Sequence, residues 1–174
     1  VDDSTRAEIE TLKALTTQAM EELLGLAREL RPTALDDHGL RVALQAQIER
    51  TATNSGCVIQ LKLADGAAAA LSALSEQQQI VVYRIVQESI SNAVQHAGPQ
   101  AIDVLVDVDR AGLPVIEIRD DGSGFPPRPS EGLGLVGMRE RARLAGGRVT
   151  FGPAQPRGTV VTLKLDGTEA RSAA

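Results

Sequence analysis

One long helix followed directly by two alternating strands constrains the fold of this chain more than any other feature. Ser75 and Gln78 have the spacing of a capping box, which opens a helix, and Gly98 ends it after residue 97. Apolar and polar residues then alternate over 102–108 and 115–120, which predicts two strands that each bury one face. This order indicates an α+β fold with helices on one face of a sheet, and not the regular βαβ repeat of a doubly wound fold.

The flanking segments extend the same layers. We expect a helix at 40–53, a strand at 58–63, a helix at 135–145, and a closing hairpin formed by 149–151 and 159–165. Only 2% of the residues are aromatic and none is Trp, so the core must be built from aliphatic side chains.

The N-terminal part predicts a further long helix. Thr5 and Glu8 form a possible capping box, and apolar residues recur at spacings of three and four until Pro32. A lone helix of about 25 residues is marginal in water unless its apolar seam is buried. The seam packs either on the chain's own body or on a second copy, and we favour the second copy. We expect the chain to be a fragment of a longer protein, with a flexible tail at 168–174.

Charge and hydropathy narrow the classes of function. A net charge of −5 argues against direct nucleic-acid binding, which needs a basic surface. No apolar run reaches the roughly 18 residues of a membrane-spanning helix, and no signal peptide is visible. The single Cys57 has no partner for an internal disulfide, which fits a reducing compartment. We therefore expect a cytoplasmic domain, whose parent protein is either free or membrane-anchored.

The predicted helix at 75–97 carries a polar stripe. Glu88, Asn92 and His96 follow at i, i+4 and i+8, so they share one face. An Asn amide oxygen is a suitable Mg²⁺ ligand, and a carboxylate one turn away can accept a proton or hold a metal-bound water. The alternative is an ordinary solvated helix face.

The strand at 115–120 ends on a second group of polar and small residues. Asp120 is in phase with the inward-facing Ile116 and Ile118, so its carboxylate points toward the core and needs a polar partner. An adenine amino group is a suitable partner, and Gly122 and Gly124 allow the backbone to approach a flat ring. The alternative is a tight turn capped by Asp120.

A third group consists of glycines that open the helix predicted at 135–145. Gly132, Gly134 and Gly137 leave backbone N–H groups free at a helix N-terminus, which suits a phosphate. The glycines do not follow a strand directly, so the dinucleotide-binding fingerprint does not apply, and no Walker-type Gly-Lys-Ser/Thr occurs. The alternative is a flexible turn.

Four short motifs, taken in chain order, resemble the nucleotide site of the Bergerat-fold ATPases. They are Glu88-x-x-x-Asn92, Asp120-x-Gly122-x-Gly124, Gly132-x-Gly134-Leu135 and Gly158-Thr159. The resemblance implies a mixed sheet covered by helices on one face, an ATP cofactor, and Mg²⁺ on Asn92. It also implies that Asp120 reads adenine, with Thr159 nearby, that Gly132 to Leu135 contact phosphates, and that Glu88 matches the general base of the hydrolases. His96 is a candidate nucleotide contact.

Longer stretches, "IVQESISNAVQHA", "GLGLVGMRERARLAGG" and "LARELRPTALDDHGLRVAL", are similar to histidine kinases paired with LuxR-type response regulators. The resemblance covers about residues 10 to 165. It implies that 1–31 is the second helix of a dimerisation domain and that 32–167 is the ATP-binding catalytic domain. The implied partners are ATP, a response regulator and, through the N-terminal helix, a second copy of the parent protein.

One feature of that subfamily is missing. Its phosphoacceptor histidine is followed by an acidic residue on the first dimerisation helix, and neither His38 nor His96 fits this pattern. We therefore expect a protein histidine kinase module that cannot phosphorylate itself. Two other functions use the same site: an anti-sigma-factor serine kinase, disfavoured by the N-terminal helix, and a nucleotide-gated dimer module without enzymatic activity.

Overall fold

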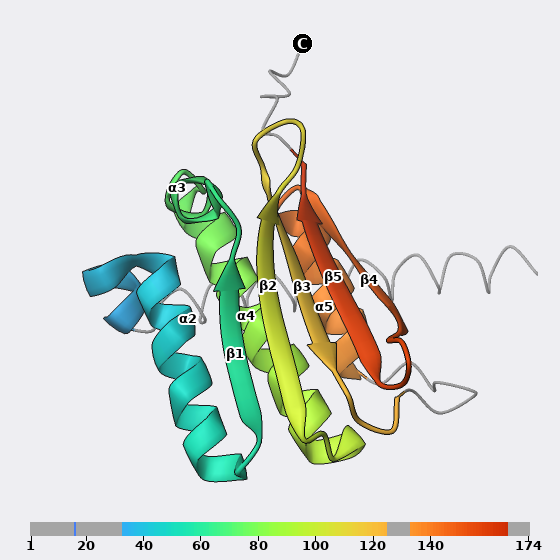
Figure 1. The fold of residues 1–174 in the computed structure, drawn as a ribbon. Coiled ribbons are helices and arrows are strands. Elements are labelled where there is room, and N and C mark those ends of the chain that lie inside the picture. Colours follow the sequence, from blue (N-terminus) through green and yellow to red (C-terminus); the bar gives the residue numbers. More distant parts are fainter. Residues whose placement is uncertain (1–15, 17–32, 125–132, 167–174) are drawn as a thin grey trace, which may run out of the picture.

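The computed structural model describes residue 16, residues 33–124 and residues 133–166 (Figure 1). Apart from Thr16, which is helical, the predicted helix at 5–31 lies outside the described residues, as do the loop at 125–131 and the tail at 168–174. The elements are, in chain order, α2 (Thr33–Ser55), β1 (Val58–Leu63), α3 (Ala67–Ser72), α4 (Glu76–Asn92), the π-helix η1 (Ala93–Ala97), β2 (Ala101–Val108), β3 (Pro114–Asp120), α5 (Leu133–Leu144), β4 (Gly147–Pro153) and β5 (Thr159–Leu165).

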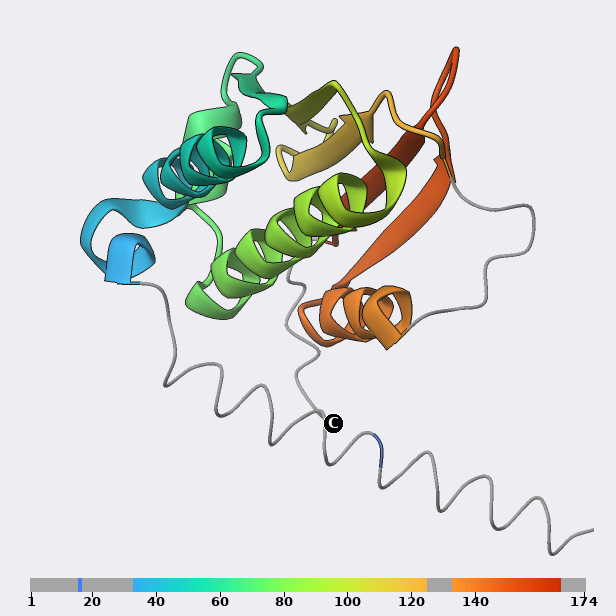
Figure 2. The same ribbon diagram turned by 90° about the horizontal axis from the view of Figure 1, so that it is seen from below.

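The five strands of the described part form one mixed sheet in the order β1-β2-β3-β5-β4. β1 runs parallel to β2, and each of the other neighbouring pairs is antiparallel. Along β2, β3 and β5, buried residues alternate with more exposed ones, so one face of the sheet is covered. The helices lie against that face (Figure 2), which confirms the predicted α+β class with its two layers.

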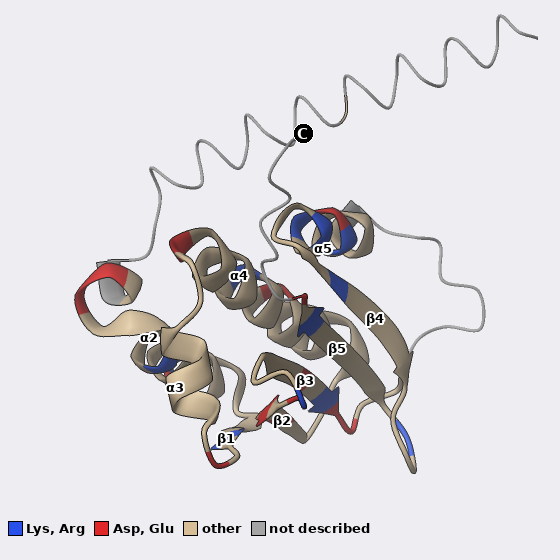
Figure 3. Cartoon of the chain, turned by 90° about the horizontal axis from the view of Figure 1, so that it is seen from above, with Lys and Arg blue, Asp and Glu red and all other residues tan. Residues whose placement is uncertain are grey.

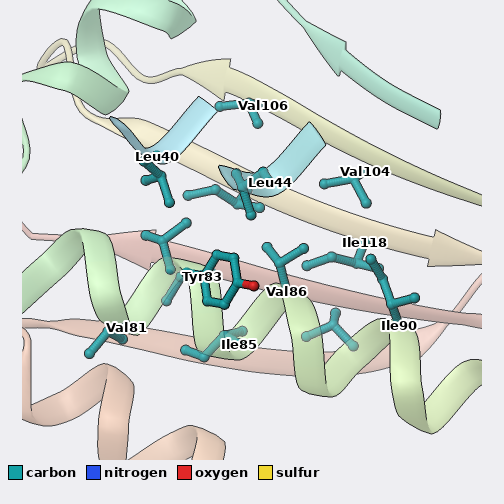
Figure 4. Close-up of a cluster of buried hydrophobic side chains, with 14 of the residues drawn as sticks. Leu40, Leu44, Val81, Tyr83, Ile85, Val86, Ile90, Val104, Val106 and Ile118 are labelled. Carbon is teal, nitrogen blue, oxygen red and sulfur yellow. The ribbon is translucent and has the colours of Figure 1, made fainter. Parts of the chain in front are cut away.

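The core lies between α4 and the covered face of the sheet. Val82, Ile85, Val86 and Ile90 of α4 are each 0% exposed and form a continuous apolar stripe. Figure 4 shows Ile85, Val86 and Ile90 of this stripe together with Leu40 and Leu44 of α2 and with strand residues that include Val104 and Ile118. The core of the described part is almost wholly aliphatic. Tyr83 is its aromatic member, and the Tyr83 hydroxyl donates to Oε1 of Gln47 at 3.3 Å.

The start of α4 confirms the predicted capping box. The backbone N–H of Gln78 donates to Oγ of Ser75 at 3.2 Å, and the backbone N–H of Ser75 donates to Oε1 of Gln78 at 3.1 Å. Two orphan donors at the helix start are thereby satisfied, which sets the position of the whole helix along the chain.

Three other helices differ from the prediction, of which α5 differs by only one or two residues at its ends. The helix expected from residue 40 begins at Thr33, with a kink at Gly39, whose φ of 77° and ψ of 171° are not helical. The short helix α3 was not predicted, because its N-cap is Gly66, which offers no side-chain hydrogen bond as a start signal.

Candidate functional site

The α4–α5 contact brings together residues from the first and third predicted groups. Nδ2 of Asn92 donates to Oε1 of Glu88 at 3.3 Å, so the two side chains share one face of α4. Gly134, at the start of α5, lies directly against them: a Cβ at this position would be 2.8 Å from Oε1 of Glu88 and 3.8 Å from Nδ2 of Asn92. The first turn of α5 thus approaches the polar stripe of α4 as closely as a glycine allows.

The hydrogen bond from Asn92 to Glu88 also determines which atom of the Asn92 amide can bind a cation. Because Nδ2 donates to Glu88, the amide oxygen is the part of Asn92 suited to bind a cation. In the part of the chain that the structure describes, no cluster of three or more His, Cys, Asp or Glu residues suits a metal ion. A Mg²⁺ ion bound at Asn92 would therefore take most of its ligands from phosphates and water, as Mg²⁺ commonly does.

Asp120 lies at the end of β3, where its carboxylate is buried. The residue is 6% exposed, and Oδ1 accepts the backbone N–H of Gly122 at 2.9 Å. This bond uses one of the two carboxylate oxygens. The inward direction predicted from the strand period is confirmed, and so is the turn-capping role that was its alternative. The turn-capping bond does not exclude a further donor, because a carboxylate has acceptor positions for several donors.

Two glycines allow the chain to pack tightly around Asp120. Gly158 has a φ of 101°, and a Cβ there would lie 1.9 Å from the carbonyl oxygen of Asp120. A Cβ at Gly124, whose φ is 77°, would lie 3.2 Å from the carbonyl oxygen of Gly158. Thr159 follows at the start of β5 and is 8% exposed. The structure therefore brings Asp120, Gly124, Gly158 and Thr159 together at one end of the sheet.

The π-helix η1 changes the position of His96. Ala93–Ala97 follows α4 with the wider π turn, so the 3.6-residue period that placed His96 in line with Glu88 and Asn92 ends at Asn92. The α-helical spacing therefore no longer gives the direction of His96, whose side chain is exposed, and its place on the shared stripe stays a prediction. A nucleotide contact by His96 stays a prediction.

The same π turn holds the loop that follows β3. The backbone N–H of Ser123 donates to the carbonyl of Ala97 at 2.9 Å, and a Cβ at Gly122 would lie 2.6 Å from that oxygen. Oδ1 of Asp121 accepts the N–H groups of Gln100 and Ala101 at 2.8 and 3.0 Å. The bond from Ala101 contributes most to holding the pKa of Asp121 below its ordinary value. The loop that carries Gly122 is thus fixed to the end of the helix.

Two cavities adjoin these groups. One of about 470 Å³ is lined by Gly124 and Leu135 from the predicted site, by Ser123, and by residues of the closing hairpin. In this cavity the guanidinium of Arg139 lies over the ring of Phe151, with Cζ 5.4 Å from the ring centroid. Sequence reasoning did not connect Phe151 with the site, because it lies on β4, which no motif marks.

The second cavity, of about 580 Å³, lies between α2 and α4 and has Glu88 on its wall. Its other lining residues are Gln47, Arg50, Thr51, Asn54, Ser55, Gln87, Ser91, Val94 and Gln95. Glu88 therefore faces a polar groove on one side and the start of α5 on the other. Gly132 lies outside the described residues, so its predicted phosphate contact is untested.

Two general properties complete the description. None of the helices in residues 33–124 and 133–166 is long and apolar enough to cross a membrane. Burial raises the pKa of the Cys57 thiol, which disfavours a thiolate at neutral pH.

Comparison with known proteins gives a consistent result. Residues 77–169 match the family described as histidine kinase-, DNA gyrase B-, and HSP90-like ATPase. The oxygen sensor histidine kinase NreB of Staphylococcus carnosus is 31% identical over 173 residues. That match takes in 97% of this chain and 47% of NreB, so the chain spans about half the length of this curated relative.

Solved structures agree in fold. The cytoplasmic segment of the histidine kinase QseC is 24% identical, with a TM-score of 0.54 over 88% of this chain and 93% of that one. Full-length ShkA in complex with AMPPNP is 18% identical, with a TM-score of 0.56 over 71% of this chain and 28% of that one. The family match includes Glu88, Asn92, Asp120 and Gly134. The chain therefore belongs to the histidine kinase-, DNA gyrase B-, and HSP90-like ATPase family, whose model matches residues 77–169.

Proposed function

We propose that this chain is the catalytic ATP-binding module of a two-component sensor histidine kinase, which works in the cytoplasm. In the whole protein, the γ-phosphate of ATP passes to a histidine and then to an aspartate of a response regulator with a LuxR-type output domain. The whole protein is a homodimer that pairs through the helix predicted at 5–31. Support comes from the similarity to NreB over 97% of this chain and from the fold shared with ShkA, which was solved with AMPPNP.

The main observation in support of an ATP site is the buried carboxylate of Asp120. Adenine presents an amino group, and a buried carboxylate that already fixes its own loop through Gly122 is a rigid acceptor for it. Gly124 and Gly158 let the loop after β3 and the start of β5 approach each other closely, which holds Asp120 in a fixed position. Thr159 lies beside this position as a further polar group.

The phosphate end of the site is proposed at the contact between α4 and α5. The N-terminal turn of α5 brings Gly134 against Glu88 and Asn92, and free N–H groups at a helix start favour phosphate. The amide oxygen of Asn92 would bind Mg²⁺, which neutralises phosphate charge during transfer. Glu88 acts beside it, as a proton acceptor or as the partner of a Mg²⁺-bound water.

Transfer to a histidine supplied by another chain tests this function. The chain is incubated with radiolabelled ATP and Mg²⁺, alone and together with a protein that carries a phosphoacceptor helix. His38 is exposed on α2, and His96 follows the helix that carries Glu88 and Asn92, two turns past Glu88, so neither is expected to approach the γ-phosphorus in line with the leaving group. We therefore expect no acid-labile label on this chain and a label on the added protein. The control replaces the acceptor histidine of the added protein by glutamine.

Two outcomes would contradict the proposal. Label on His38 or His96 would mean that the acceptor lies within this chain. ATP binding without transfer to any acceptor helix would favour the nucleotide-gated dimer module.

A further inference from the structure

The cavity of about 470 Å³ beside α5 carries positive charge that the proposed site does not yet use. The charged residues among its described lining are two arginines, Arg139 of α5 and Arg157 of the turn between β4 and β5. Figure 3 shows basic residues, in blue, on α5 and on the hairpin that joins β4 to β5. In a chain of net charge −5, a cavity with two guanidinium groups in its wall indicates an anionic ligand.

An aromatic ring fixes the position of one of these cations. Cζ of Arg139 lies 5.4 Å from the centroid of the Phe151 ring, within the range of a cation–π contact. Phe151 opposes the buried Val161 of β5 and is in phase with the buried Val149 of its own strand, so its ring lies on the covered face of the sheet. A guanidinium held in one place presents its N–H donors as a fixed fork, which suits a phosphate group.

The same cavity borders the proposed nucleotide site. Gly124 and Gly158, which pack around the proposed adenine position, belong to its wall. Leu135 also lines it and lies in the first turn of α5, where the phosphates are proposed. Leu135 and Arg139 are four residues apart and therefore share one face of α5. A nucleotide that spans the adenine position and the first turn of α5 would lie beside this cavity.

We propose that the cavity binds the phosphate chain of the nucleotide, with Arg139, held on Phe151, as its main cation and Arg157 as a second one. The inference rests on the proposed function, in which ATP is the ligand, and it adds side-chain contacts to the backbone contacts proposed at the start of α5. Phosphate oxygens accept charge-assisted hydrogen bonds from a guanidinium, and two cations offset part of the charge of a triphosphate. Arg139 is thus a binding residue, and Phe151 is the positioning residue that holds it.

The test compares Arg139→Gln and Arg139→Lys with a matched control, Arg143→Gln. Arg143 is on the same helix, its side chain is 63% exposed and it pairs with Glu140, so the control removes an equal charge that does not line the cavity. Calorimetry measures the affinity of each chain for a non-hydrolysable ATP analogue and for adenosine, which carries no phosphate. Thermal unfolding checks that each variant is folded.

We expect Arg139→Gln to weaken binding of the ATP analogue about tenfold, which corresponds to the loss of one hydrogen bond from a charged donor. Its affinity for adenosine should equal that of the parent chain. Arg139→Lys should recover part of the loss, because lysine keeps the charge but not the planar fork, and Arg143→Gln should bind both ligands as the parent chain does. Unchanged affinity for the analogue in Arg139→Gln, or an equal loss of affinity for adenosine, would overturn the proposal.

Phe151→Leu tests the positioning role of the ring. Leucine keeps an apolar side chain on β4 but removes the ring beneath the guanidinium, so affinity for the analogue should fall about threefold and affinity for adenosine should not change. In the Arg139→Gln background, Phe151→Leu should have no further effect, because no guanidinium is left to hold. Additive losses in this double-mutant cycle would show that Phe151 does not act through Arg139.

Tripolyphosphate, which lacks the base and the ribose, identifies the source of the anion. If the cavity holds the phosphate chain of the nucleotide, tripolyphosphate competes with the ATP analogue for the parent chain. Binding of both ligands together, without competition, would overturn the proposal in favour of a separate site for a free phosphate anion.

Tripolyphosphate also keeps this inference separate from the proposed function. If the parent chain does not bind the ATP analogue, the proposed function fails, and the NMR signals of the Phe151 ring are followed during titration with tripolyphosphate instead. Shifts in the parent chain and in Arg143→Gln that are absent from Arg139→Gln support a phosphate site at Arg139. Signals that do not shift in the parent chain overturn it.

Discussion

Replacing Asp120 by asparagine separates the observed turn-capping role of its carboxylate from the adenine contact that we propose for it. One oxygen accepts the N–H of Gly122 at 2.9 Å, and the asparagine oxygen can replace it there. We therefore expect the free energy of unfolding to change by no more than about 1 kcal/mol. The other oxygen becomes an NH₂ group, which presents a donor to the donor on adenine.

The loss in affinity follows from the hydrogen bond that is removed. A bond to a charged, buried group contributes about 1.5–3 kcal/mol, so ATP binding should weaken about 10- to 150-fold. Asp120→Ala, in contrast, also removes the acceptor for Gly122 and should lower the melting temperature. GTP, which has no amino group at the corresponding ring position, should bind the parent chain much more weakly than ATP.

Calorimetry with ATP, GTP and each variant measures these affinities, and thermal unfolding monitors the fold. Unchanged ATP affinity in Asp120→Asn would refute the adenine contact, as would equal affinity of the parent chain for ATP and GTP. A large loss of stability in Asp120→Asn would show that both oxygens serve the fold.

Two further predictions concern Mg²⁺ and acid stability. Asn92→Ala should abolish the increase in ATP affinity that Mg²⁺ causes, because the amide oxygen is the proposed Mg²⁺ ligand. Calorimetry with and without Mg²⁺ measures this increase. An undiminished Mg²⁺ effect in the variant would exclude Asn92 as the ligand. Asp121 has a folded-state pKa below its ordinary value of 3.8, chiefly because the N–H of Ala101 donates to it. Its stabilising contribution is therefore present above that value and is lost as pH falls below it. Asp121→Asn should have a lower melting temperature than the parent chain at neutral pH, and this difference should shrink as the pH falls below 3.8. A difference in melting temperature that stays constant over this pH range would contradict the reasoning.

Local signals in the sequence were sufficient for most elements of the described part. The capping box at Ser75 and Gln78 placed α4, because its two bonds form within one turn of helix. Strict alternation placed β2 and β3 and predicted the inward direction of Asp120, since side chains on a strand alternate by geometry. The short helix α3 lacked any such signal and was missed.

In the candidate site, too, some contacts could be predicted from local spacing and others could not. Glu88 and Asn92 are four residues apart on one helix, so their contact could be predicted from spacing. His96 could not be placed, because the change to a π turn at Ala93 depends on how the end of the helix packs on the loop at Gly122.

By itself, the sequence determined the aliphatic core through its composition. It also determined most of the elements, the buried Asp120 and the pairing of Glu88 with Asn92, because each of these depends on neighbours within a few residues. Only the tertiary structure decided that Gly134 lies on Glu88 and that Gly158 lies on the carbonyl of Asp120. These contacts join residues far apart in the chain. Their geometry depends on how closely two backbones approach when the helices pack on the sheet, and no local pattern encodes that distance.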